Sequence, residues 1–158
     1  MTTSTTSAVR KTVTVAAPLA IAFEVFTAQI ETWWPMASHH IGDADCQAVV
    51  IEPRVGGRWY EVGDDGTVCE WGKVLEWEPP RRFVLAWQLN HEWQYDPDFV
   101  TELEVRFVAE GDATRVDLEH RNLERYGERV AEVRRSLDAP GGWTGALEAF
   151  AAAVAAQS

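Results

Sequence analysis

The sequence predicts an α+β domain in which a curved antiparallel sheet wraps around a long C-terminal helix. Several segments with strand character follow one another at short intervals and are separated by turn sequences, which is typical of consecutive hairpins. The segments near the N-terminus and at the C-terminus instead show the apolar spacing of helices. Strands and helices that are segregated along the chain indicate the α+β class, with a sheet of about six to seven strands.

The N-terminal part of the chain predicts one strand and one or two short helices. Val9–Val15 is rich in β-branched residues and is expected to be the first strand. Pro18 is expected to open a helix, because its missing N–H costs nothing at that position. The apolar face of this helix consists of Leu19, Ala22, Phe23 and Phe26. A second short helix is expected at Glu31–Trp34, before Pro35.

The middle of the chain reads as a series of strands. We expect them at Ala48–Glu52, Arg58–Val62, Val68–Trp77, Phe83–Leu89, Thr101–Phe107 and Thr114–His120. Asp65-Gly66 is a hairpin signal between two of these strands. Gly72, inside a long strand, predicts a β-bulge.

The C-terminal part predicts two amphipathic helices. The first carries Tyr126, Val130, Val133 and Leu137 at helical spacing. The second, Gly141–Ala156, follows Pro140 and is rich in alanine, the best helix former. Its apolar face consists of Trp143, Leu147, Phe150 and Val154. A helix this apolar needs a broad partner, so we expect it to lie against the sheet and to enclose a cavity.

Composition limits the class of protein. The 158 residues predict a single domain over residues 8–156, after a Thr/Ser-rich disordered tail at residues 1–7 that lacks the apolar stretch of a signal peptide. The formal charge of −11 disfavours nucleic acids and anionic membranes as partners. Cys46 and Cys69 form no C-x-x-C motif and are expected to be reduced thiols of a cytoplasmic protein.

A set of short motifs, in this order, resembles a known superfamily. They are Ala17-Pro18 with Phe23 and Phe26-Thr27, Trp33-Trp34, Pro53-Arg54-Val55-Gly56-Gly57, Asp65-Gly66, Gly72-Lys73-Val74 with Glu76, Pro79-Pro80 with Arg82 and Trp87, Thr114-Arg115-Val116 with His120, and Gly142-Trp143. They cover Val9 to Val154 and resemble the SRPBCC (START, birch-pollen-allergen-like) superfamily. The branch they resemble contains proteins similar to the C-terminal domain of the activator of the heat-shock chaperone ATPase.

This resemblance implies a helix-grip fold with a hydrophobic cavity under the sheet, closed by the C-terminal helix. It implies no single activity, because superfamily members carry lipids, bind hormones or plant metabolites, cyclise polyketides or bind a chaperone. One departure concerns the cavity mouth: the break at Asp138–Gly142 interrupts what is usually a longer final helix.

Strand alternation and the eight tryptophans predict an aromatic ligand site. The predicted ligand-binding residues are Trp33, Trp34, Trp59, Tyr60, Leu85, Trp87, Leu103, Val105, His120, Trp143, Leu147 and Phe150. Trp87 and Trp143 are the strongest candidates, and Trp71 and Trp93 could add to the aromatic walls.

Three polar sites have alternative interpretations. His120 falls on the inner face by parity and is either a weak candidate for a general base or a neutral core histidine. Glu76 is either a raised-pKa acid facing the cavity or a solvated surface residue. His39-His40, near Asp43 and Asp45, match no metal cage, so neither a metal nor a cofactor is predicted.

The leading hypothesis is therefore that the protein binds a small apolar or aromatic molecule. One alternative is a cyclase- or hydratase-type enzyme in which His120 is the acid or base. The other is a chaperone co-factor or another protein-binding module. Formation of a homodimer stays open, and the sequence names no ligand.

Overall fold

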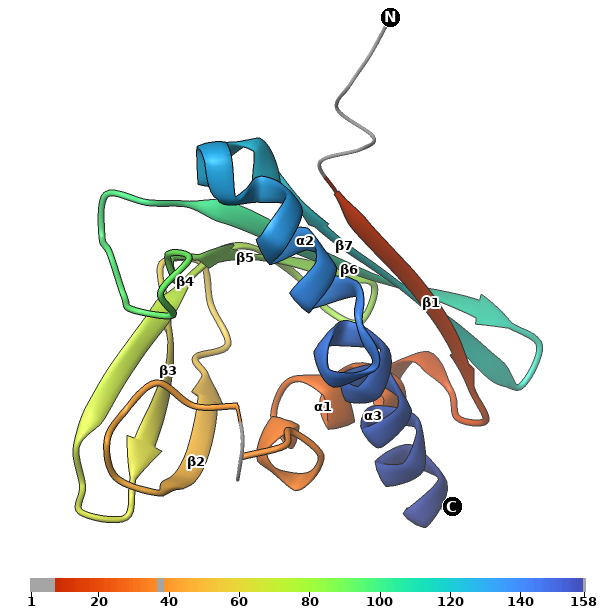
Figure 1. Ribbon diagram of the computed structural model, residues 1–158. Coiled ribbons are helices and arrows are strands. Elements are labelled where there is room, and N and C mark those ends of the chain that lie inside the picture. The colour runs from red at the N-terminus through yellow and green to blue at the C-terminus, as the bar shows by residue number, and fades with distance from the viewer. Residues whose placement is uncertain (1–7, 37–38, 158) are drawn as a thin grey trace, which may run out of the picture.

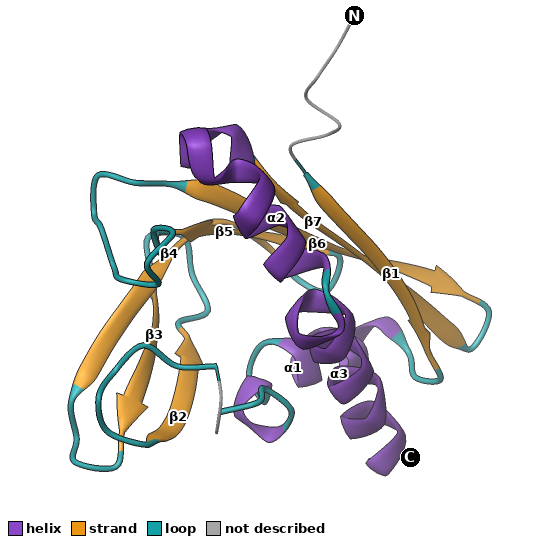
Figure 2. Ribbon diagram, in the orientation of Figure 1, coloured by secondary structure: helices purple, strands orange, loops and turns teal. Residues whose placement is uncertain are grey.

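The computed structural model describes residues 8–36 and 39–157, which form a seven-stranded antiparallel sheet with helices on its concave face (Figures 1 and 2). The predicted tail, residues 1–7, lies outside the described residues. In the order β1-β7-β6-β5-β4-β3-β2, the chain places its first strand beside its last. The strands are β1 Val9–Val15, β2 Cys46–Ile51, β3 Arg58–Gly63, β4 Val68–Glu78, β5 Arg82–Trp87, β6 Thr101–Glu110 and β7 Ala113–Arg121. The predicted α+β class and antiparallel sheet are confirmed.

The helices come in two groups. Between β1 and β2 lie α1 Leu19–Phe26 and the 3-10 turn η2 Ile30–Thr32, and after β7 come η3 Leu123–Arg129, α2 Val130–Asp138, the wide turn η4 Pro140–Thr144 and α3 Gly145–Ala156. Helix α3 packs against α1 and β1, inside the curve of the sheet (Figure 1). No helix among the described residues is long and apolar enough to span a membrane.

Aromatic side chains fill one end of the space between the sheet and the helices. Phe83 and Phe107 on the inner face of the sheet contact Phe23 of α1 at ring-centre distances of 5.8 and 5.1 Å. Phe150 of α3 is fully buried and lies 4.9 Å from Phe26. Burying one such ring stabilises the fold by about 1.5–3 kcal/mol, so this cluster holds α1 and α3 on the sheet.

The bulge predicted at Gly72 is present as two irregularities that flank this residue. Trp59 pairs with Gly72 and Tyr60 pairs with Glu70, so Trp71 is an extra residue in β4. A second register shift lies between Val74 and Glu76. Regular alternation would place Trp71 and Gly72 on opposite faces of the sheet, but the bulge turns the buried Trp71 toward the inner face.

Two predicted helices differ from the structure because of glycines. The helix expected over Tyr126–Leu137 is interrupted at Gly127, whose φ of 60° is left-handed, so α2 begins at Val130. The final helix was expected from Gly141, but α3 begins only at Gly145, after a turn in which Gly142 is non-helical. A Cβ at Gly142 would come within 2.3 Å of the carbonyl oxygen of Leu137, so the close contact at this break requires glycine.

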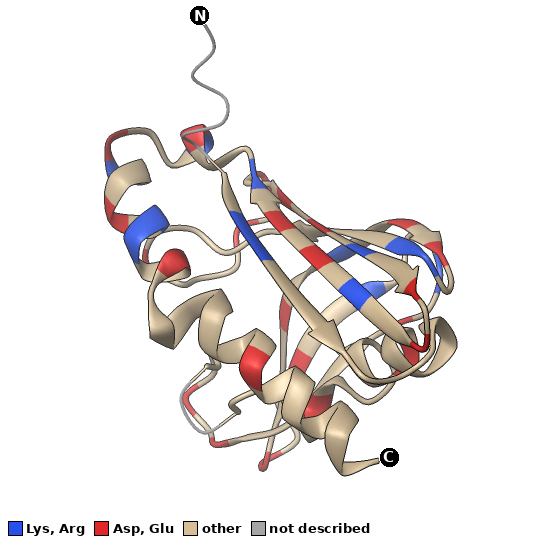
Figure 3. Cartoon of the chain, turned by 90° about the vertical axis from the view of Figure 1, so that its right-hand side faces the viewer, with Lys and Arg blue, Asp and Glu red and all other residues tan. Residues whose placement is uncertain are grey.

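Charged residues recur along the strands of the sheet (Figure 3), and ion pairs join several of them on its outer face. At its centre, the buried Glu104 accepts hydrogen bonds from Arg82, Arg106 and Arg121 at 2.5, 2.7 and 2.5 Å. Burial raises the pKa of the Glu104 carboxyl, but the hydrogen bonds from the three guanidinium groups outweigh burial and lower this pKa to about 2. The outer face is therefore a network of ion pairs, and the apolar chemistry of the molecule is confined to the inner face.

Candidate functional site

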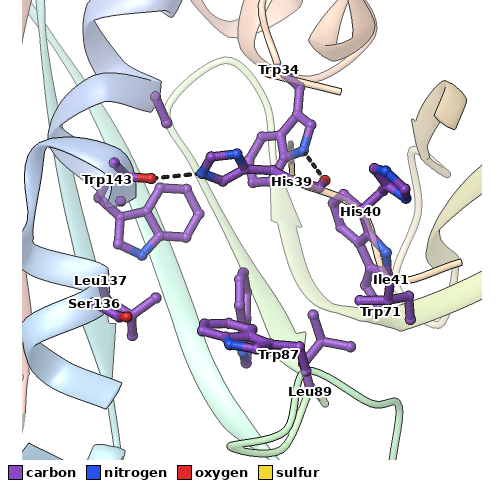
Figure 4. Close-up of a pocket in the computed structure, with 14 residues that line it drawn as sticks. Trp34, His39, His40, Ile41, Trp71, Trp87, Leu89, Ser136, Leu137 and Trp143 are labelled. Atoms are coloured by element: carbon purple, nitrogen blue, oxygen red, sulfur yellow. Dashed lines mark hydrogen bonds between the residues drawn. The ribbon is translucent and has the colours of Figure 1, made fainter. Parts of the chain in front are cut away.

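A pocket of about 330 Å³ lies at the end of the inner face that the phenylalanines do not fill (Figure 4). It is bounded by the loop after η2, by β4 and β5, and by the break between α2 and α3. Its lining residues are Trp34, His39, His40, Ile41, Trp71, Trp87, Leu89, Trp93, Ser136, Leu137, Gly141, Gly142, Trp143 and Ala146. Its volume lies near the lower end of the range for small-molecule sites, about 300–1,000 Å³.

Tryptophans from five separate segments line the pocket, and four of them form its inner walls. Trp34 lies 5.2 Å from Trp71 and 5.9 Å from Trp143, and Trp87 lies 5.8 Å from Trp143. The rings meet at inclined angles, an arrangement that favours edge-to-face contact. Trp59 is buried behind this wall, 5.3 Å from Trp71 and 5.7 Å from Trp87. The aromatic wall is thus supported from behind and holds its shape.

His39 connects the loop after η2 to the break before α3. Its Nε2 lies 2.6 Å from the carbonyl oxygen of Gly141, and its own carbonyl accepts a hydrogen bond from the indole of Trp34 at 2.9 Å (Figure 4). Because a carbonyl can only accept, Nε2 carries the proton in this arrangement. An imidazole therefore joins the two sides of the pocket.

Glu61, in β3, holds a second part of the wall. This carboxylate is 1% exposed and accepts hydrogen bonds from the backbone N–H of Ile41 at 2.6 Å and of Gly42 at 3.0 Å. It also accepts one from the indole N–H of Trp71 at 2.8 Å. Since Ile41 and Trp71 both line the pocket, one buried carboxylate fixes a loop and a strand relative to each other.

His120 is fully buried behind Trp87 and Trp143. Its Nδ1 accepts a hydrogen bond from the indole of Trp143 at 3.2 Å, so Nε2 is the protonated nitrogen of a neutral ring. Nε2 donates to the hydroxyl of Thr101 at 2.9 Å, and that hydroxyl donates to the carbonyl of Trp87 at 3.3 Å. Both ring nitrogens are engaged, and the chain of hydrogen bonds orients the indole of Trp143 in the pocket.

The buried His120 should make the stability of the protein depend on pH. Burial lowers its pKa to about 3, against about 6.5 in an unfolded chain. Between pH 3 and pH 6.5 the imidazole is protonated in the unfolded state but neutral in the folded state. The contribution of neutral His120 to the free energy of unfolding is therefore complete above about pH 6.5 and is lost as the pH falls toward 3. From pH 7 to pH 5 we expect a loss of about 2 kcal/mol from this group, to be measured by urea unfolding.

The variant His120→Gln provides the comparison. Glutamine offers one acceptor and one donor, so it can satisfy Trp143 and Thr101, but it does not titrate. Between pH 7 and pH 5, the free energy of unfolding of His120→Gln should therefore fall by about 2 kcal/mol less than that of the native protein. Equal slopes in the two proteins would show that His120 is not held neutral.

The structure divides the predicted ligand-binding residues into three groups. Trp34, Trp87 and Trp143 line the pocket. Tyr60 points to the outer face, where the guanidinium of Arg58 lies 4.6 Å from its ring. The others, which are buried in the core, are Trp33, Trp59, Leu85, Leu103, Val105, His120, Leu147 and Phe150. Alternation correctly identifies the inner face of the sheet, but that face is longer than the pocket.

Several lining residues were not predicted, and one candidate acid is corrected. Ile41, Leu89 and Leu137 line the pocket. Ile41 comes from a loop without periodicity, whereas Leu89 shares the predicted parity of Trp87 and Leu137 lies on the apolar face of a predicted helix, so both could have been included. Glu61 could have been found, because it shares the parity of Trp59. Glu76 faces outward, and a hydrogen bond from Arg82 lowers its pKa, so its interpretation as a raised-pKa acid in the cavity is wrong.

The thiols and histidines offer no other evident centre. Burial raises the pKa of both Cys46 and Cys69, which keeps them protonated and weakly nucleophilic. Within residues 8–36 and 39–157, no group of three or more His, Cys, Asp or Glu side chains could hold a metal ion. The chemistry of the described site is therefore aromatic contact plus a few hydrogen-bonding groups.

A curved antiparallel sheet that closes on a C-terminal helix above an apolar pocket defines the helix-grip class, the fold of the SRPBCC superfamily. Residues 16–155 match the family model described as "Activator of Hsp90 ATPase homolog 1-like protein", and the chain belongs to this family. The match covers β2 to β7 but not β1, which ends at Val15, and it includes every residue of the pocket.

Two solved structures are similar to this chain in sequence as well as fold. The anthrahydroquino-γ-pyrone synthase Txn09 is 42% identical, with 91% of this chain and 94% of that chain covered and a TM-score of 0.64. CalC, a self-sacrificing resistance protein from Micromonospora echinospora, is 33% identical, with 96% of each chain covered and a TM-score of 0.70.

Protein MLL2253 from Mesorhizobium loti shares the fold at 18% identity, with 96% of this chain and 98% of that chain covered and a TM-score of 0.68. A search of curated proteins gave no match. The family and its neighbours support a ligand-binding or cyclase-type role.

Proposed function

We propose that the protein binds a small planar aromatic molecule in the tryptophan-lined pocket. The observation that carries this proposal is that five of the eight tryptophans line one pocket: Trp34, Trp71, Trp87, Trp93 and Trp143. Indole rings offer flat apolar surface with a single donor each, which suits a rigid ring system better than a flexible chain. A ligand of this kind replaces water along the walls and contacts ring edges on several sides.

The polar groups of the pocket suggest a ligand with oxygen substituents. His39, His40 and Ser136 bring hydrogen-bonding side chains to a lining that is otherwise apolar. A few polar groups in an apolar site orient a ligand, while the apolar walls supply most of the affinity. The similar synthase is an anthrahydroquino-γ-pyrone synthase, and this supports a fused-ring quinone or phenol as the chemical class.

The test is a titration with alizarin, a dihydroxyanthraquinone, followed by quenching of tryptophan fluorescence and by native mass spectrometry. We expect one molecule to bind per chain with a Kd in the micromolar range. Trp143→Leu should weaken binding by about tenfold, because it removes one wall of the pocket. Trp77→Phe is the control, since Trp77 packs on Phe23 outside the pocket and its replacement should leave the Kd unchanged. No binding by the native protein would contradict the proposal.

A cyclase-type activity is the second candidate, because the relative with 42% identity is a synthase. Only a group that reaches the pocket can exchange a proton with a substrate. His39 and His40 line the pocket, whereas His120 is fully buried behind its wall. An o-hydroxyaryl 1,3-diketone closes to a γ-pyrone when its phenol oxygen attacks the distal carbonyl carbon and one water molecule leaves. This turnover should be lost in His39→Gln and kept in His91→Gln, whose histidine is not part of the lining. Equal turnover by His39→Gln and the native protein would exclude His39 as the group that transfers the proton.

A role as a chaperone partner is less well supported by the surface. A docking site for a partner usually presents a contiguous apolar patch. Among the described residues, the exposed large apolar side chains Ile21, Val55, Val68, Trp93 and Val108 lie on separate elements. This distribution favours the ligand pocket over a protein-binding face, and homodimer formation stays a prediction.

A further inference from the structure

The loop between β5 and β6 holds Trp93 in an unusual backbone conformation. Its φ of 60° is left-handed, a region that side chains other than glycine and asparagine rarely adopt. The N–H of Trp93 donates to the carbonyl of Asn90 at 2.9 Å, and the N–H of Asn90 donates to the carbonyl of Gln94 at 2.9 Å. A turn of this kind normally carries glycine at its left-handed position. Tryptophan at this position therefore makes the turn less stable than glycine would.

Hydrogen bonds within the loop hold its backbone. The side-chain oxygen of Asn90 accepts hydrogen bonds from the N–H groups of Glu92 and Gln94 at 2.9 and 3.1 Å. Below the turn, Leu89 pairs with Tyr95 as an isolated β-bridge. These contacts over-determine the backbone, which is the condition under which a strained residue persists.

The side chain of Trp93 adds a second unfavourable feature. The residue is 40% exposed, although it belongs to the wall of the pocket. The ring lies 6.3 Å from that of Trp87 at an angle of 80°, so only its inner part has an aromatic neighbour. Trp93 thus combines a strained backbone with an exposed aromatic side chain, and it lies on the rim of the pocket. Both features are unfavourable in the empty pocket, so we expect this residue to act when a ligand is bound.

We propose that Trp93 is a specificity-determining residue that covers the outer face of the bound molecule and becomes buried by it. This proposal rests on the proposed function and deepens it. It requires a ligand that extends from the inner tryptophans to the rim and presents a flat apolar or aromatic face there. A compact ligand with a polar group at the rim would leave the indole exposed and is disfavoured.

Hydroxyl-radical footprinting of the native protein tests the burial of Trp93 directly. Oxidation of each tryptophan is measured by mass spectrometry with and without saturating alizarin. We expect the oxidation rate of Trp93 to fall several-fold when alizarin binds. Trp77, which is half-buried and lies outside the pocket, serves as the internal control and should be unaffected.

Two variants separate the ring from the backbone. Asparagine accepts the left-handed conformation, so Trp93→Asn removes the ring and keeps the turn, and its melting temperature should stay close to that of the native protein. We expect Trp93→Asn to bind alizarin about five- to tenfold more weakly. Trp93→Phe keeps an aromatic face and should stay within about threefold of the native Kd.

Each outcome decides the proposal. The proposal is supported if alizarin protects Trp93 from oxidation and if Trp93→Asn, but not Trp93→Phe, binds alizarin weakly. Binding by the native protein without protection of Trp93, or with equal affinity in Trp93→Asn, overturns the role of Trp93 and leaves the proposed ligand site intact. Equal loss of affinity in Trp93→Phe and Trp93→Asn overturns it as well, because the aromatic face would then be irrelevant. Absence of binding by the native protein is the failure of the proposed function, and the role of Trp93 falls with it.

Discussion

Replacing Gly72 by alanine is expected to lower the free energy of unfolding by about 3 kcal/mol. A Cβ at this position would lie 1.7 Å from the carbonyl oxygen of Ala86, which belongs to the neighbouring strand. Because the obstacle is backbone, no side-chain rotation can relieve the clash, and β4 must move away from β5. Gly72 pairs with Trp87 and follows Trp71, so the displaced strands carry two walls of the pocket. Binding of alizarin should therefore be lost with the stability.

Urea unfolding measures this effect, and Gly141→Ala is the matched control. An added Cβ at Gly141 meets no atom within 4 Å, so that change should alter the unfolding free energy by less than about 0.5 kcal/mol. If the midpoint of Gly72→Ala coincided with that of the native protein, the close approach of β4 and β5 would be disproved.

Replacing Glu61 by glutamine is expected to lower the free energy of unfolding by about 2–3 kcal/mol, although the two side chains have the same shape. A carboxylate only accepts hydrogen bonds, and it meets three donors here: the N–H groups of Ile41, Gly42 and Trp71. The amide NH₂ of glutamine must replace one of the two oxygens. At least one donor then faces another donor in a buried site and loses its partner.

Ile41 and Trp71 share one carboxylate oxygen, so the donor that faces the new NH₂ is the N–H of Gly42. The same change should weaken alizarin binding, since it loosens the loop that brings Ile41 to the wall of the pocket. Glu148→Gln, on the exposed side of α3, removes the same charge from a surface position and is the control. Stability equal to that of Glu148→Gln would mean that Glu61 is not the acceptor that joins the loop to β4.

The sheet could be predicted well from the sequence because strand alternation is a local signal. In β6, Leu103, Val105 and Phe107 alternate with charged residues, and all three are buried on the inner face together with Thr101. The same parity placed His120 inside, where it is fully buried. Parity does not predict which side chain His120 contacts. The hydrogen bond from Trp143, through which His120 orients that indole, is seen only in the tertiary structure.

The pocket was harder to predict because its walls come from segments that are far apart in the chain. Phe150 and Trp143 lie on the same predicted helix, yet one is locked in the phenylalanine cluster and the other lines the pocket. The break at Pro140–Thr144 makes the division: Trp143 lies inside this turn, next to the non-helical Gly142, whereas Phe150 lies in α3, which begins after the turn. Glycine and proline mark such a break in the sequence, but they do not give its angle.

The sequence by itself determined the fold class, the inner face of the sheet and the aromatic character of the interior, because alternation, helical spacing and composition are properties of neighbouring residues. The tertiary structure decided where that interior stays open. It did so through a bulge that turns Trp71 inward, a carboxylate that ties Ile41 to β4, and a strained loop that brings Trp93 to the rim. All three depend on contacts across β-strands and loops, and the free energy of such contacts is set by their geometry in space rather than by their order along the chain.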